Sequence, residues 1–540
     1  MKRLGYCVGI LKPDEVIFTS EEPVSLGEFV IIESEEMDGE RVKILGIVTS
    51  VDRLDTFLDK DSYHPEVYEK ITNLHRSPGI FRATVSIRGL LGRDLSLQNL
   101  RYPPRPGSRV FRPDEKTLKD IFSSGNSKSH IKIGTLLGHK DVEVSVDLNQ
   151  IVSRHLAVLA ITGGGKSNAV SVILEEIAKK RGTVIVFDVH GEYESAEYID
   201  ERGKNVVNVI DVKINLKDLS ADEIATLCGI DFERSSRQYF VIQKLVECVS
   251  KRRKKSLNIP GNGTLDPFED LEDSSNAFID ELIETVENMI YAKSRKKKEG
   301  EEEYGDFEGI IPEECGFYHA VQKEELQGVY IRLENLKRKL GKRIDDKAKS
   351  VVDSIKVGFI NVLNMKSLDY DVMDVIVSHT LYKLLSERKK SIHGDSSLIN
   401  VPVVVVIEEA HIFAPYGGST RTKDALSKVA REARKFGLGV ILVSQRPKGL
   451  DPDILSQMNN WVILRIVEPE DQKHIQRASE TLSGDLLNYL SALNPGEAVL
   501  LGPFVKIPLL VKFRKSEAKK AGGDISAVDE WERWRLNLGS

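Results

Sequence analysis

From about residue 150 onward, short apolar runs alternate with longer helical segments, and this alternation restricts the possible folds more than any other feature. An uninterrupted run of Val, Ile and Leu is typical of a strand that helices cover on both faces. The alternation therefore predicts an α/β domain built around a parallel sheet. The expected strands are Leu156–Ala160, Val184–Phe187, Val206–Ile210, Phe359–Leu363, Val403–Ile407, Val440–Val443 and Trp461–Ile466.

A glycine-rich turn follows the first of these strands and precedes the amphipathic segment Ala169–Lys180. Strand, glycine turn, Lys-Ser and helix is the order of a P-loop, whose backbone N–H groups and helix N-terminus surround phosphate oxygens. Lys166 would reach the β- and γ-phosphates of ATP, and the hydroxyl of Ser167 would bind Mg²⁺. The usual pattern begins with Gly where this chain has Ala160. The expected nucleotide contacts are Thr162, Gly163, Gly164, Gly165, Lys166, Ser167 and Asn168.

Two adjacent carboxylates, Glu408 and Glu409, follow the apolar strand Val403–Ile407. This is the pattern of a Walker B strand, and the alternation of side chains at a strand end predicts that the two acids point in different directions. We assign Glu408 to Mg²⁺, directly or through water, and Glu409 to polarising the attacking water. General-base assistance of this kind is worth on the order of 10²–10⁴-fold in rate.

Two further strands end in polar residues that are candidates for the same site. Gln445 follows Val440–Val443, where an ATPase with a catalytic Glu presents a polar group to the γ-phosphate and the water; an ordinary loop amide is the alternative interpretation. Asp188 follows Val184–Phe187 and is expected to face the site as well.

Composition changes along the chain and predicts further domains. The first 140 or so residues carry short β-type runs separated by Gly and Pro, which favours a small barrel or sandwich. Residues 217–350 are rich in Glu, Lys, Leu and Ile and are expected to form a helical insertion in the α/β domain. The predicted division is a barrel domain 1–145, an ATPase core 146–216, the insertion 217–350, the rest of the core 351–512 and an extension 513–540.

The composition also excludes several classes of protein. No run approaches the roughly 18 apolar residues of a membrane span, and the N-terminus lacks an apolar signal core, so we expect a cytoplasmic protein without membrane contact. Cys7, Cys228, Cys248 and Cys315 are scattered without C-x-x-C spacing, which predicts reduced thiols, neither a zinc site nor a disulfide framework. The net charge of -6 is unlike that of a protein that coats polyanions along its whole surface.

These motifs together resemble those of the HerA/FtsK group of hexameric DNA-pumping ATPases, and the HerA family most closely. The matching stretches are Thr162–Asn168, Phe187–Tyr193, Ile407–His411, Arg431–Gly437, Ser444–Pro447 and Pro469–Asp471. The order of barrel, ATPase core and helical insertion fits too, so the resemblance covers most of the chain. Glu408 stands where many relatives have Asp.

The resemblance implies a RecA-like core in a homohexamer that moves along double-stranded DNA with ATP and Mg²⁺. It further implies a NurA-type nuclease as partner in DNA end resection and double-strand-break repair. Rings of this type complete each site with an arginine of the neighbouring subunit. Arg434 matches the family position best and Arg154 is the second candidate; an ordinary salt bridge is the alternative for each. Such an arginine is worth roughly 10³–10⁵ in rate.

Two other functions remain open from the residues alone: a ring ATPase that moves protein, and an NTP-dependent scaffold that activates a nuclease. In a ring only channel-facing residues meet DNA, so the negative total charge does not exclude a DNA partner. Residues 1–70 are acidic and residues 71–140 are basic. We therefore expect one face of the barrel, either the face of Arg105 and Arg109 or that of Glu35 and Glu36, to receive the nuclease. Trp531 and Trp534, three residues apart, suggest that the C-terminal extension contacts a neighbouring subunit or its own domain.

Overall fold

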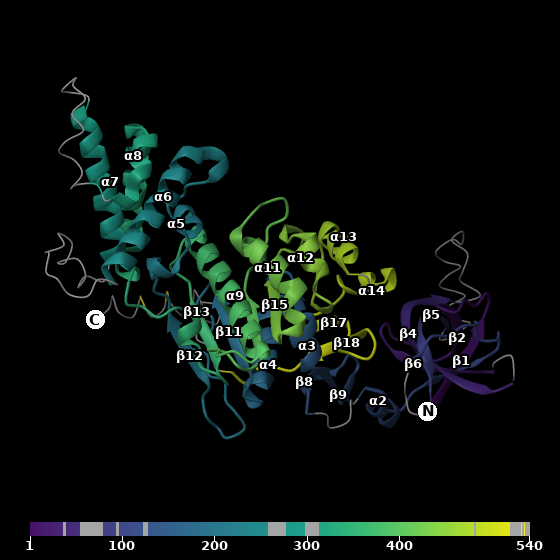
Figure 1. Cartoon of the computed structure of the whole chain (residues 1–540). Helices are drawn as coiled ribbons and strands as arrows, with labels where there is room; N and C mark the ends of the chain where they lie inside the picture. The colour runs from purple at the N-terminus through teal and green to yellow at the C-terminus, as the bar shows by residue number, and fades with distance from the viewer. Residues whose placement is uncertain are drawn as a thin grey trace.

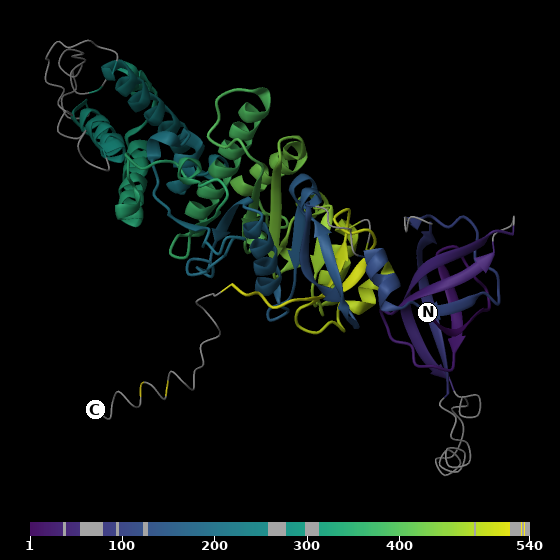
Figure 2. The same cartoon turned by 90° about the horizontal axis from the view of Figure 1, so that it is seen from below.

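A computed structural model shows an elongated molecule in which a β-barrel and a bundle of helices lie at opposite ends of a central α/β core (Figures 1 and 2). None of the described helices is long and apolar enough to cross a membrane. The structure describes residues 1–35, 39–54, 79–92, 97–122, 128–257, 277–296, 311, 313–479, 482–518, 531 and 534.

The N-terminal barrel is a seven-stranded antiparallel sheet in the order β2-β1-β7-β3-β4-β5-β6, which closes because β2 also pairs with β5. Strands such as β2 alternate buried and less buried residues, so that one face points into the barrel interior, whereas β3 buries Phe29–Ile32 on both faces. The barrel predicted from the sequence is confirmed. The strands are β1 Lys2–Val8, β2 Glu15–Ser20, β3 Phe29–Glu35, β4 Arg41–Leu54, β5 Ile80–Leu91, β6 Leu97–Gln98 and β7 Arg109–Arg112.

The core contains an eleven-stranded sheet in the order β12-β13-β11-β14-β15-β10-β16-β17-β18-β8-β9. All seven strands predicted for the α/β domain are present, they are mutually parallel, and most are buried along their whole length. The strands are β8 His130–Leu136, β9 His139–Asp147, β10 Leu156–Leu159, β11 Thr183–Asp188, β12 Val207–Asp211, β13 Ile360–Asn364, β14 Val403–Ile407, β15 Leu438–Ser444, β16 Asn460–Ile463, β17 Glu497–Leu501 and β18 Leu509–Phe513.

One side of this sheet is antiparallel, which the sequence analysis did not anticipate. β17 and β18 extend the sheet beyond β16, and β8 and β9 follow β18. β8 and most of β9 fall within the range 1–145 assigned to the barrel domain, yet they belong to the core sheet because Leu136 and Thr135 of β8 pair with Val511 and Lys512 of β18. Their short alternating pattern is the same in a barrel and at the edge of a mixed sheet, so the pattern could not distinguish the two.

Helices pack around the core sheet and present their apolar faces to it; α4, for example, buries nine of its fourteen residues. The core helices are α3 Leu148–Arg154, α4 Lys166–Lys179, α9 Tyr370–His393, α10 Ala410–Phe413, α11 Arg421–Glu432, α12 Pro452–Ser456, α13 Pro469–Ala478 and α14 Gly484–Tyr489, with 3₁₀ turns η5 Val352–Ser354, η6 Ala433–Lys435 and η7 Pro447–Gly449. Helix α2, Glu115–Phe122, lies between barrel and core.

The described part of residues 217–350 is helical, as predicted, and projects from the core beyond β12 and β13 (Figure 1). Its elements are η1 Leu216–Asp218, α5 Ala221–Leu227, α6 Phe232–Leu257, α7 Ala277–Lys296, η3 Glu313–Ala320, α8 Lys323–Leu340 and η4 Gly341–Arg343. A disulfide joins Cys248 of α6 to Cys315 of η3, whose Cα atoms are 5.2 Å apart. The prediction that all four cysteines are reduced is therefore wrong for this pair, because the fold brings together residues 67 positions apart in sequence. Cys7 and Cys228 are free and buried.

Candidate ATPase site

The predicted site residues gather where four neighbouring parallel strands end. The order β11-β14-β15-β10 and its register align Phe187 with Ile407, Ile407 with Leu442, and Ser444 with Leu159. The residues that follow these strands therefore meet at the carboxyl edge of the sheet, the usual place for a ligand in an α/β fold.

The glycine-rich turn after β10 has the shape of a phosphate-binding loop. Gly163 and Gly165 have left-handed φ angles of 76° and 98°, which favour glycine. A Cβ added to Gly165 would lie 2.8 Å from the backbone nitrogen of Gly496, so no larger residue fits this turn. Helix α4 begins at Lys166 and adds the positive end of its dipole. These features fit a bound phosphate chain.

Lys166 lies between the two acids that follow β14. Its Nζ is 2.7 Å from Glu409 Oε1 and 3.8 Å from Glu408 Oε2, and all three side chains are largely buried. The two acids follow each other in sequence, yet both converge on this one ammonium group. The reason is local: Glu409 is outside the strand, and its φ of 48° and ψ of 44° place it in the left-handed region at the N-cap of α10.

Glu409 keeps one oxygen available for a ligand. Its side chain is 4% exposed, and Oε2 has no hydrogen-bond partner within the part of the chain that the structure describes. His411 Nδ1 lies 3.3 Å from this oxygen and 3.2 Å from Ser444 Oγ. Burial lowers the pKa of His411 despite the nearby charge of Glu409, which favours a neutral ring. A buried acceptor without a partner is costly, so this oxygen is well placed to hold a water molecule.

Gln445 contacts the P-loop directly. Thr162 Oγ1 donates a hydrogen bond of 2.9 Å to Gln445 Oε1, which ties the loop after β15 to the loop after β10. Gln445 thus lies beside the expected phosphate position.

The side chains of Asp188 and Asn168 form hydrogen bonds with backbone groups of nearby segments. Asp188 accepts the backbone N–H groups of Gly191, Glu192 and Tyr193 at 2.8–3.0 Å, and its carboxylate shapes the turn after β11. Asn168 donates to the carbonyl of Arg514 and accepts the N–H of Ser516, each at 2.9 Å. Its side chain therefore holds the segment after β18 beside the P-loop helix.

The two candidate arginines lie at the other edge of the sheet. Arg154 ends α3, two positions before β10 begins, and Arg434 lies in η6, four positions before β15 begins. Both strands run away from them toward the P-loop and Gln445, and a strand of four to seven residues spans roughly 13–23 Å. The strand directions therefore separate both arginines from the phosphate loop of their own chain.

Two residues near the site escaped the sequence analysis as individual candidates. Tyr193 Oη donates a 2.6 Å hydrogen bond to Glu408 Oε1, and the tyrosine is fully buried. His411 directly follows the paired acids, as described above. Both lie in stretches that carried the family resemblance, Phe187–Tyr193 and Ile407–His411, and that context was the available signal.

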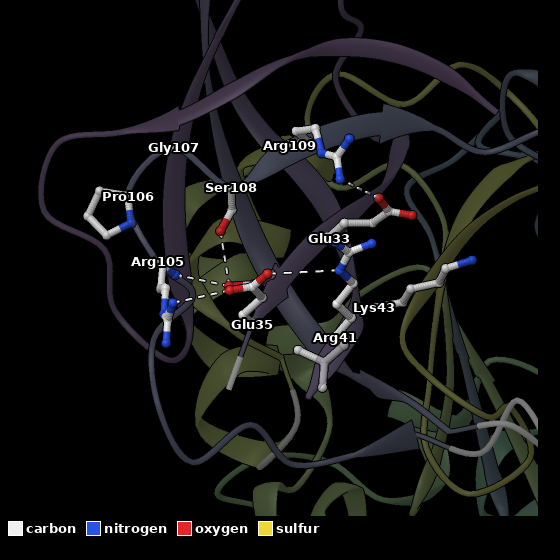
Figure 3. A pocket seen from close by; sticks show the side chains of 11 residues that line it. Glu33, Glu35, Arg41, Lys43, Arg105, Pro106, Gly107, Ser108 and Arg109 are labelled. Atoms are coloured by element: carbon white, nitrogen blue, oxygen red, sulfur yellow. Dashed lines mark hydrogen bonds and ion pairs between the residues drawn. The ribbon is translucent and has the colours of Figure 1, made fainter. Parts of the chain in front are cut away.

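A separate pocket of about 370 Å³ lies on the barrel, away from the ATPase site (Figure 3). Arg105 lies 3.2 Å from Glu35, and Arg109 lies 3.7 Å from Glu33, across this pocket. The acidic and basic residues that the sequence separates are thus neighbours, because β3 and β7 pair in the barrel. Glu36 lies outside the described residues.

Three family models match successive parts of the chain. Residues 4–79 match the HAS barrel domain, residues 131–384 match "Helicase HerA, central domain", and residues 343–501 match "Helicase HerA-like C-terminal". A protein of Sulfurisphaera tokodaii named DNA double-strand break repair helicase HerA is 36% identical over 98% of this chain and 96% of its own length. The chain belongs to the HerA helicase family. With its P-loop and paired acids, it is an ATPase of that family.

A second HerA relative and one solved structure are also similar to the chain. The protein of the same name from Sulfolobus acidocaldarius is 34% identical over 98% of this chain and 97% of its own length. The solved structure of VirB4 of Thermoanaerobacter pseudethanolicus covers 73% of this chain and 99% of its own, with a TM-score of 0.48 and 15% identity.

Proposed function

We propose that this HerA-family ATPase forms a homohexamer that moves along double-stranded DNA and acts with a NurA-type nuclease in DNA end resection and double-strand-break repair. Relatives that match nearly the full chain carry the name DNA double-strand break repair helicase, which supports the DNA substrate and the repair role. A cytoplasmic location remains a prediction.

The observation that carries the proposal is the arrangement of Lys166 between Glu408 and Glu409 at the end of a P-loop. Bound Mg²⁺ neutralises phosphate charge and aligns the ATP for attack. Ser167 and Glu408 have the hydroxyl and carboxylate oxygens that Mg²⁺ prefers, and we assign them to hold it. Lys166 is expected to leave Glu409 for the β- and γ-phosphates when ATP binds.

Release of Lys166 would free Glu409 to act as the base. We assign its Oε2, which has no hydrogen bond within the described ranges, to accept a proton from the attacking water. Gln445, held by Thr162, orients that water and the γ-phosphate. The backbone N–H groups of residues 163–167 bind the remaining phosphate oxygens.

The position of Arg154 and Arg434 supports a ring. Because both lie at the sheet edge away from their own P-loop, either can complete an ATP site only from a neighbouring subunit. Of the C-terminal extension, residues 513–518 with Trp531 and Trp534 are described; both tryptophans are exposed. We propose that they contact a neighbour.

The deciding experiment measures ATP hydrolysis with and without linear duplex DNA, with molar mass measured alongside. We expect the protein to be a hexamer, and we expect duplex DNA to stimulate its ATP hydrolysis. Lys166→Ala should abolish nucleotide binding, whereas Glu409→Gln should retain binding and lose about 10²–10⁴-fold in rate.

If the protein is a monomer and duplex DNA does not change its rate of ATP hydrolysis, the proposal of a DNA translocase is contradicted. If the protein is a hexamer and DNA does not change its rate of ATP hydrolysis, a ring ATPase that moves protein is favoured. Unchanged hydrolysis by Glu409→Gln would remove Glu409 from the base role while leaving the DNA question open.

A further inference from the structure

The hydroxyl of Tyr193 is directed at one oxygen of Glu408 from inside the protein. The tyrosine is 0% exposed, and its Oη donates to Glu408 Oε1 at 2.6 Å. A tyrosine hydroxyl has an ordinary pKa of about 10 and is therefore a hydrogen-bond donor at neutral pH. Hydrogen bonds to a charged acceptor are short and strong.

A turn built around Asp188 brings Tyr193 to this position. Asp188 ends β11 and is itself buried, and Asp188 Oδ2 accepts the backbone N–H of Tyr193 at 2.8 Å. The register that pairs Phe187 with Ile407 makes Asp188 and Glu408 neighbours at the ends of adjacent strands. The carboxylate of Asp188 therefore folds the turn back so that the phenol meets the acid on the next strand.

The hydrogen bond orients the carboxylate of Glu408. With Oε1 held by Tyr193, Oε2 is the oxygen that faces Lys166 Nζ, at 3.8 Å. A long acid side chain has several rotamers, and the hydrogen bond from the buried phenol favours one of them.

We propose that Tyr193 is a positioning residue for Glu408: its hydroxyl, presented by the Asp188 turn, holds the carboxylate so that Oε2 faces the phosphate-binding side of the site. Tyr193 acts through Glu408 and does not touch the nucleotide. This inference rests on the proposed function, in which Glu408 holds Mg²⁺. Partners of this kind tune a metal-holding side chain, and their loss costs about 10–100-fold in metal affinity or activity.

The test uses Tyr193→Phe, which removes the hydroxyl and keeps the ring. Binding of a non-hydrolysable ATP analogue is titrated with Mg²⁺ in the absence of turnover. We expect the half-saturating Mg²⁺ concentration to rise about tenfold. In hydrolysis, kcat should fall by about the same factor, while KM for ATP at saturating Mg²⁺ changes less than about twofold.

Tyr198→Phe is the matched control. Tyr198 is also fully buried, and its hydroxyl bonds to Ser171 Oγ at 3.4 Å and not to either acid. It should lower thermal stability to a similar extent without changing the Mg²⁺ titration.

Glu408→Gln distinguishes failure of the positioning role from failure of the proposed function. If Glu408→Gln weakens the response to Mg²⁺ and Tyr193→Phe does not, the positioning role is overturned and the proposed function stands. If Glu408→Gln itself leaves the Mg²⁺ titration unchanged, the assignment of Glu408 fails, and the positioning role fails with it. In the Glu408→Gln background, Tyr193→Phe should add little; a full additional effect would also overturn the inference.

Discussion

At the scale of single residues, strained backbone positions lie at both ends of the core strands. Glu409 has a left-handed φ at the carboxyl edge, and His155 has one, at 60°, directly before β10 at the amino edge. Such conformations cost about 1–3 kcal/mol in residues other than glycine and persist where the surroundings hold them. At Glu409 the left-handed turn lets two consecutive acids approach Lys166. The conformation of His155 is held by two hydrogen bonds of its imidazole ring.

The ring of His155 gives a prediction about pH. It is buried, Val440 N donates to Nδ1 at 3.1 Å, and Nε2 lies 3.2 Å from the carbonyl of Ala430, so the neutral ring is held. Burial lowers the pKa of His155 from 6.5 to about 4. The unfolded chain therefore takes up the proton first, and the stabilisation is complete above pH 6.5 and is lost as the pH falls toward 4.

We expect His155 to account for about 2–3 kcal/mol of lost unfolding free energy over that window. Chemical denaturation at stepped pH measures it. His155→Gln, which does not titrate, should show a shallower dependence on pH; identical slopes would contradict the prediction.

At the scale of elements, the segment after β18 is bound to the P-loop helix. Glu175 of α4 accepts from Ala518 N at 2.7 Å and from Arg514 at 2.5 Å, and Asn168 holds the backbone on either side of Lys515. Burial raises the pKa of Glu175, but these hydrogen bonds and one from Ser516 outweigh it and leave the pKa below its ordinary value.

Arg514→Ala should loosen this segment. Removing a charged partner from a largely buried carboxylate is expected to cost about 1–3 kcal/mol of unfolding free energy. Hydrogen exchange at residues 514–518 should rise. Lys132→Ala, which breaks an exposed pair with Glu143, is the control and should cost below about 1 kcal/mol. Unchanged exchange in Arg514→Ala would show that the ion pairs do not hold the segment.

The disulfide between Cys248 and Cys315 links two elements of the helical insertion. It closes a loop with a sequence separation of 67 between α6 and η3. Reduction is expected to lower the unfolding free energy of the helical insertion by roughly 3–4 kcal/mol, chiefly by releasing the unfolded chain. Thermal unfolding with and without reductant measures it. Cys248→Ser should unfold at the same temperature as the reduced protein, with or without reductant. If reductant does not change the unfolding temperature of the wild type, the prediction is wrong.

At the scale of the whole molecule, the barrel and the ATPase core share a packed contact. Barrel residues Phe29 and Ile47 belong to the same apolar cluster as core strands, and the rings of Phe29 and Phe122 are 4.8 Å apart. Tyr489 of α14 adds polar contacts: its hydroxyl accepts from Gly27 N at 3.1 Å and donates to the carbonyl of Val48. A partner bound to the barrel would therefore be joined mechanically to the core.

Tyr489→Phe tests this connection. Hydrogen exchange should rise at residues 25–29 and 45–48, which face the core, and stay unchanged in β1 and β2. The expected loss of unfolding free energy is about 1–2 kcal/mol. Tyr6→Phe, in an exposed tyrosine of β1, is the control. Equal exchange in wild type and Tyr489→Phe would mean that the apolar contact alone joins the two parts.

The sequence by itself determined the parallel strands, the barrel, the helical insertion and the residues at the end of each core strand. These features are local: apolar runs, glycine turns and adjacent acids occupy consecutive positions, and parallel strands bring their ends to one edge. The proposed domain boundaries remain predictions, and the position of β8 favours placing the first one before His130.

Only the tertiary structure decided which distant residues meet. The pairing of β8 with β18, the Cys248–Cys315 disulfide and the contact of Tyr193 with Glu408 each join positions 67 or more residues apart. Short edge strands, scattered cysteines and a single tyrosine carry no local pattern that names a partner. Their partners are set by register, packing and burial, which exist only after the chain has folded.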